Sequence, residues 1–128
     1  SIKDIGKCHK TVTKMEKLEL HPSMCCISYD QLLEFRDNSQ LLYGNAYHKF
    51  TMRDIVDRII KPVCKESKAC YAQYLNSEGL KVSAFITHTW DENFKTFVES
   101  IESVFETTMQ KPNLWICAFA LYQGNEED

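Results

Sequence analysis

Four side chains of different chemistry stand in a row at His88, Thr89, Trp90 and Asp91, directly after a short apolar run. An imidazole exchanges protons near neutral pH, and an indole can stack on a planar ligand. The free amides at the start of a following helix can hold a phosphate. These four residues are therefore candidates for binding a ligand.

Gln123 and Asn125 hold the corresponding place after a second apolar run, residues 114–121. Because the carboxyl ends of parallel strands meet at one edge of a sheet, we expect all six candidate side chains to surround one pocket. An alternative fits the sequence equally well. In this alternative, His88 forms a hydrogen bond to a neighbouring loop, Trp90 packs on the sheet edge and Asp91 only caps the next helix.

The elements that would position these residues are a strand, a helix and a strand over residues 82–122. The run 114–121 is continuously apolar, and Val82, Ala84, Phe85 and Ile86 form a shorter apolar run. Such runs are typical of parallel strands that are covered on both faces. Between them a stripe of apolar residues at helical spacing predicts a helix, capped by Asp91: Phe94, Phe97, Val98, Ile101, Val104, Phe105. A crossover of this length predicts parallel pairing in a Rossmann-like α/β sheet.

The preceding part of the chain reads as helical. Ser28 with Gln31 has capping-box spacing and predicts a helix to about Asp37, followed by a loop over residues 38–49. Thr51 with Asp54 predicts a second, strongly amphipathic helix. Pro62 should end or kink that helix, since it has no amide proton.

Three segments follow from these assignments: a basic arm over 1–27, a helical region over 28–80 and the strand-helix-strand portion over 81–128. Two strands alone do not make a stable sheet. We expect the missing neighbours to come from a hidden strand within residues 28–44, from another chain, or from sequence beyond Asp128. The α/β portion is accordingly predicted to be incomplete.

The charge argues against a general nucleic-acid binder, because the net charge is -3 and the pI is near 5.8. No apolar run is long enough to span a membrane. Lysines recur at steps of three and four near the start of the chain and are candidates for docking on an acidic partner or membrane surface, although a solvated helix face explains them as well. They are Lys3, Lys7, Lys10, Lys14 and Lys17.

The six cysteines are predicted to be free thiols in a reducing compartment. Cys25 and Cys26 are adjacent and badly placed to bridge each other, and Cys117 within an apolar run predicts an inert core thiol. The cysteine and histidine spacings match no regular zinc site, so we expect no metal. The expected location is intracellular and cytoplasmic, with organelle targeting left open because the chain starts at Ser1.

Residues 84–94, continuing through Phe97 and Val98, resemble the first strand and helix of Toll/interleukin-receptor-like (TIR-like) domains. The likeness is to uncharacterised TIR-like proteins of algae and other protists, in which a strand ending in His-x-Trp precedes an acidic, Phe-containing helix. Here His88 and Trp90 form that element, and residues 115–120 with Gln123 look like the second strand. The resemblance covers about residues 51–125.

Enzymatic TIR domains cleave the nicotinamide–ribose bond of NAD, and their catalytic glutamate lies on a later helix, often in a Trp-Cys-x-x-Glu context. This sequence contains no such motif. The resemblance therefore implies a noncatalytic protein-interaction or assembly module, with a protein partner or a second copy of itself and no cofactor. The alternative is an NAD-cleaving or nucleotide-binding enzyme that is completed by further sequence or by a partner chain.

Overall fold

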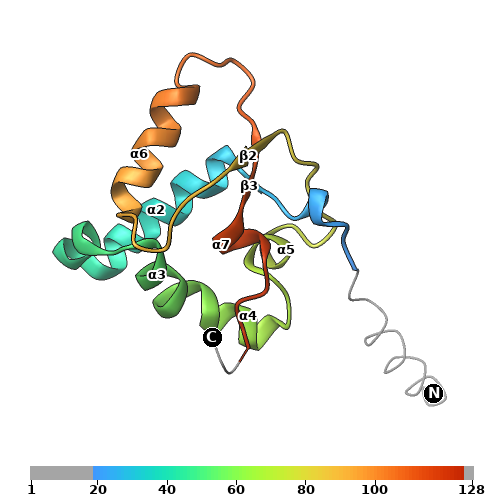
Figure 1. The fold of residues 1–128 in the computed structure, drawn as a ribbon, viewed down its shortest axis with the longest axis horizontal. Helices are drawn as coiled ribbons and strands as arrows, with labels where there is room; N and C mark the ends of the chain where they lie inside the picture. The colour runs from blue at the N-terminus through green and yellow to red at the C-terminus, as the bar shows by residue number, and fades with distance from the viewer. Residues whose placement is uncertain (1–18, 126–128) are drawn as a thin grey trace.

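A computed structural model describes residues 19–125, which form helices around a small mixed sheet (Figure 1). The elements in chain order are η1 Pro22–Met24, β1 Ile27–Ser28, α2 Tyr29–Tyr43, η2 Gly44–Lys49, α3 Met52–Ile55, η3 Val56–Ile60, α4 Lys61–Ser67, α5 Tyr71–Leu75, β2 Ala84–Ile86, α6 Phe94–Phe105, β3 Asn113–Ile116 and α7 Cys117–Ala120. No helix in this part of the chain is long and apolar enough to cross a membrane.

The sheet has the order β1-β3-β2. Strands β2 and β3 are parallel, with Ala84 opposite Leu114 and Ile86 opposite Ile116, and α6 connects them. The predicted parallel pairing is confirmed. The third strand is β1, which pairs with β3 in the antiparallel sense, so the sheet is mixed and its third strand comes from this chain.

The second apolar run does not form one strand, which corrects the prediction for residues 114–121. Strand β3 ends at Ile116, and α7 follows at once. Ala118, Phe119 and Ala120 are all buried, and the Phe119 ring lies 5.0 Å from the ring of Phe35 on α2. A continuous apolar run fits a buried helical turn as well as a buried strand, because both are surrounded by other side chains.

One face of the sheet is open, contrary to the prediction that both would be covered. Leu114 and Ile116 are fully buried beneath the helices. On the opposite face Phe85 is 67% exposed, and its ring lies 5.8 Å from that of Trp115. The Trp115 indole N–H donates to the Pro22 carbonyl at 3.0 Å, so the segment around η1 covers part of this face.

Helix α2 begins where its capping box predicts. The Ser28 hydroxyl accepts from the Gln31 amide at 3.0 Å, and the Gln31 side chain accepts from the Ser28 amide at 2.8 Å. The helix continues to Tyr43 rather than ending near Asp37, and a 3-10 helix replaces the expected loop. Ser39 is buried on this extension, and its hydroxyl is satisfied there because it donates to the Phe35 carbonyl at 2.8 Å.

The second capping box, Thr51 with Asp54, is also present and opens α3. Helical structure then runs from Met52 to Ser67, so Pro62 does not end it, but α-helical geometry stops at Ile55 and resumes at Lys61, directly before Pro62. A π-helical stretch, η3, directly precedes the turn that contains Pro62. The wider turn therefore lies beside a residue that cannot donate an amide proton to the preceding turn.

The core lies between α2, α6, the covered face of the sheet and α7 (Figure 1). Phe35 is at its centre, with edge-on ring contacts to Tyr71, Phe94 and Phe119 at 5.4, 5.7 and 5.0 Å. Edge-on packing of aromatic rings stabilises the folded protein beyond the contribution that comes from burying their apolar area. Residues from Ile27 to Phe119 share this one core.

Candidate functional site

His88 is held by aromatic packing. Its ring lies 5.1 Å from the ring of Trp90 and 5.7 Å from that of Phe97, edge-on in both contacts. The Nδ1 atom is 3.3 Å from the Thr89 carbonyl, while Nε2 is buried and has no hydrogen-bond partner among the described residues. The ring therefore braces the loop after β2 against α6.

Asp91 does not cap α6, which corrects the prediction. The Asn93 side chain caps this helix instead, accepting from the Thr96 amide at 2.9 Å and donating to the His48 carbonyl at 2.9 Å. A turn over residues 89–92 moves Asp91 away from the helix start, leaving its side chain 91% exposed. Its carboxylate lies 3.8 Å from the Arg53 guanidinium.

Trp90 and Gln123 are the two predicted residues that the structure brings together. They line a cavity of about 250 Å³ with Arg53, Asp57 and Lys61. The Arg53 amide donates to the Trp90 carbonyl at 3.0 Å, which attaches α3 to the loop after β2. The Lys61 ammonium lies 3.6 Å from the Asp57 carboxylate, so acidic and basic groups both face the cavity.

The remaining predicted residues lie apart from this cavity lining. Thr89 and Asn125 are exposed, and the Thr89 amide donates to the Glu92 carboxylate at 3.3 Å. The five lysine candidates, Lys3, Lys7, Lys10, Lys14 and Lys17, fall outside the residues that the structure describes. Sequence reasoning missed Arg53, Asp57 and Lys61, although their spacing of four places them on one helix face.

A second concave surface, the β2–α6 groove, lies between the end of β2 and α6. Its volume is about 210 Å³ and its walls are mainly apolar. The lining residues are Ile86, Thr87, Glu92, Phe97, Ser100, Ile101, Val104 and Phe105. The side of β2 away from β3 pairs with no strand in the described part of the chain, and Val104 is 69% exposed at the groove.

The cysteines of the described segment, Cys25, Cys26, Cys64, Cys70 and Cys117, are free thiols. Burial raises the pKa of the Cys117 thiol, which starts α7 rather than lying within a strand. Within residues 19–125 no group of three or more His, Cys, Asp or Glu side chains could hold a metal ion.

Comparisons of the chain with protein-family models, with curated proteins and with solved structures find no match.

Proposed function

We propose that this protein is a noncatalytic interaction module that binds an extended segment of a partner protein along the free edge of β2. The observation that carries the proposal is the position of the β2–α6 groove beside that edge. A strand edge offers backbone donors and acceptors to another chain, and an adjacent apolar groove offers a place for its side chains.

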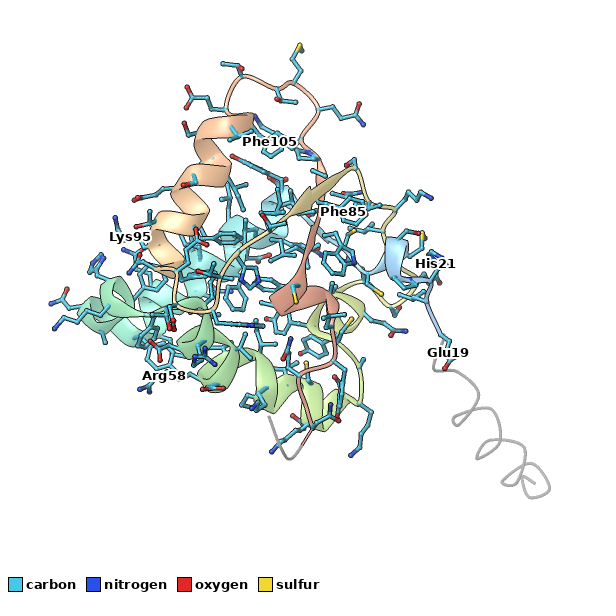
Figure 2. The ribbon with its side chains drawn as sticks, viewed as in Figure 1. Glu19, His21, Arg58, Phe85, Lys95 and Phe105 are labelled. Atoms are coloured by element: carbon cyan, nitrogen blue, oxygen red, sulfur yellow. The ribbon has the colours of Figure 1, made fainter. Side chains whose placement is uncertain are left out.

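Both faces of an added strand would meet apolar surface. Side chains alternate across a strand, so those on one face would enter the groove next to Ile86 and Val104. Those on the other face would lie beside Phe85, which is exposed on the open side of the sheet (Figure 2). The partner segment should therefore carry apolar residues at successive positions.

The groove also favours a positively charged residue of the partner at one of its ends. Glu92 is the charged residue of its lining, and the carboxylate already accepts a hydrogen bond from the Thr89 amide. A lysine or arginine of the partner near this carboxylate would be favoured, and an acidic residue would be disfavoured. This gives the proposed partner a direction as well as an apolar pattern.

The TIR-like resemblance belongs to the same proposal. Its support is the order β2, α6, β3 with parallel strands, which is what the resemblance implies for the first strand and helix. The absence of a Trp-Cys-x-x-Glu motif from the sequence favours a binding role over NAD cleavage.

A displayed library of short linear peptides with apolar residues at successive positions tests the binding surface. Val104→Arg places a charge in the groove and should reduce binding of the selected peptides at least about tenfold, a loss of about 1.4 kcal/mol. Leu41→Arg is the matched control, because Leu41 is 86% exposed on α2 and is not part of the groove lining. Equal binding by the two variants would contradict the proposal.

A nucleotide-binding or NAD-cleaving enzyme is the second candidate. It is favoured by one observation, the cavity that Trp90 and Gln123 share with Arg53 and Lys61. Titration with NAD distinguishes the candidates: this second function predicts a change in tryptophan fluorescence that Trp90→Phe removes and Trp115→Phe retains. An unchanged spectrum at saturating NAD would remove it.

A further inference from the structure

The cavity that Trp90 and Gln123 line lies where open parallel sheets bind ligands. Trp90 comes from the loop after β2, and Gln123 follows α7, which directly succeeds β3. Both segments leave the carboxyl ends of the parallel pair β2–β3, and ligands bind in the crevice at such ends. This cavity is separate from the β2–α6 groove, because the two linings share no residue.

The other wall of the cavity is one face of the helical stretch that begins with α3. Arg53, Asp57 and Lys61 line it at steps of four residues. Asp57 lies in the π-helical turn η3, and such turns occur frequently at functional sites. The Arg53 amide donates to the Trp90 carbonyl at 3.0 Å, so a backbone hydrogen bond joins the two walls.

The charged groups of the described lining favour a single negative charge on the ligand. The Asp57 carboxylate lies 3.6 Å from the Lys61 ammonium and offsets its charge. The Arg53 guanidinium lies 3.8 Å from the Asp91 carboxylate, which is not part of the lining. Because that ion pair is exposed and contributes little, the carboxylate of a ligand can replace Asp91. A guanidinium binds a carboxylate through two parallel hydrogen bonds.

The apolar part of the lining favours a flat ring. It consists of Val56 and the Trp90 side chain, and planar rings stack on an indole. Trp90 also packs against the core, and the His88 ring lies edge-on 5.1 Å from it, so the indole is already held in place before a ligand arrives.

The size of the cavity favours a ligand of one ring. Its volume is about 250 Å³, below the range of about 300–1,000 Å³ that is usual for pockets of drug-sized ligands. A dinucleotide is larger than such ligands and carries two phosphates, whereas the described lining has one positive charge in excess.

We propose that this cavity is a binding site for a small aromatic carboxylate. Its carboxylate binds the Arg53 guanidinium, its ring packs on Trp90 and Val56, and Gln123 supplies a further amide donor. A free amino acid is less suitable, because its ammonium group would enter a lining in which positive charge exceeds negative charge. The inference does not depend on peptide binding at the β2–α6 groove.

Isothermal titration calorimetry of the full, folded chain with benzoate tests the ligand class. Benzamide is the matched probe, because it keeps the ring and lacks the charge. Benzoate should bind at least about tenfold more tightly than benzamide, since a hydrogen bond between two charged groups is stronger than one to a neutral amide. NAD and phenylalanine serve as the nucleotide and amino-acid probes, and both should bind more weakly than benzoate.

Two arginine variants test the residue that binds the carboxylate. Arg53→Gln should weaken benzoate binding at least about tenfold, because it removes the charge and leaves the backbone bond to Trp90 in place. Arg58→Gln makes the same change at a side chain that lies over the Phe50 ring, at the edge of the molecule in Figure 2, and should bind benzoate like the unaltered chain.

The unaltered chain also reports the location without any substitution. Benzoate should shift the backbone amide resonances of residues 53–57 and of Trp90, and should leave those of residues 100–105 at the β2–α6 groove unchanged. This readout gives an answer even where an arginine variant folds poorly.

Four results would overturn the inference: no benzoate binding at millimolar concentrations, equal binding of benzamide, tighter binding of NAD or phenylalanine, or an equal loss in Arg53→Gln and Arg58→Gln. Val104→Arg should leave benzoate binding unchanged, because Val104 lines only the groove. The aromatic-carboxylate site can therefore fail while the proposed peptide binding stands, and the reverse also holds.

Discussion

Asn76 shows how one side chain can hold three segments together. Its side-chain amide donates to the Cys26 carbonyl at 3.1 Å and to Gln31 Oε1 at 2.9 Å, and its carbonyl oxygen accepts from Gln31 Nε2 at 2.9 Å. The segment before β1, the first turn of α2 and the end of α5 all meet at this residue.

Asn76→Ala should therefore lower the free energy of unfolding by about 1–3 kcal/mol, because it leaves partly buried groups without partners. Urea denaturation measures the change. Ser77→Ala, at the exposed neighbouring position, is the control and should change little. A loss below about 0.5 kcal/mol for Asn76→Ala would show that this network does not stabilise the fold.

Tyr47 supplies a prediction of pH dependence. Burial raises the pKa of its phenol from 10 to about 12, and the hydroxyl has no hydrogen-bond partner among the described residues. Above pH 10 an unfolded tyrosine loses its proton while the folded one keeps it. The contribution of Tyr47 to stability is thus complete below pH 10 and is lost as the pH rises towards 12.

Tyr47→Phe should make the fall of stability above pH 10 shallower and should cost little near neutrality, because it removes a buried hydroxyl. Urea denaturation of both proteins across neutral and alkaline pH checks this. An identical alkaline slope in the variant would mean that the Tyr47 phenol does not titrate differently in the folded state.

The elements follow local signals where those signals are side-chain hydrogen bonds. Ser28 with Gln31 and Thr51 with Asp54 place the starts of α2 and α3 correctly, because a capping box is decided within four residues. The ends were harder to predict. Whether residues 117–120 continue β3 or turn into α7 depends on Phe119 packing against Phe35, a contact far away in sequence.

The start of α6 gives a direct test at the scale of elements. Asn93→Ala should destabilise the protein by about 0.5–2 kcal/mol, since it removes the cap. Asp91→Ala should stay within about 0.5 kcal/mol, because an exposed ion pair contributes little. Thermal or urea unfolding of the two variants decides between them, and a larger loss for Asp91→Ala would restore Asp91 as the cap.

The whole molecule depends on one shared core, which predicts cooperative unfolding. Phe35→Ala removes a ring that contacts Tyr71, Phe94 and Phe119 and should cost about 3–5 kcal/mol. Tryptophan fluorescence and far-UV circular dichroism should report one common transition in both proteins. Two separate transitions would show that the helices and the sheet unfold independently.

The parallel pair β2–β3 was predictable at this scale, because the length and apolar stripe of α6 are local properties. The open face and the third strand were not. Strand β1 is only Ile27–Ser28, too short to give an alternating pattern, and Phe85 is apolar yet 67% exposed. Within the candidate site, the sequence predicted that Trp90 and Gln123 would line one cavity. The β2–α6 groove could not be predicted in this way, because it is defined only when the positions of both β2 and α6 are known.

Backbone amide exchange at β2 tests the central claim most directly, with and without a peptide selected by the folded protein. Strand addition predicts slower exchange at alternate amides of residues 84–87, and loss of binding when every second peptide amide is N-methylated in one register but not in the other. Unchanged exchange at β2, or equal binding by both methylated peptides, would contradict an added strand.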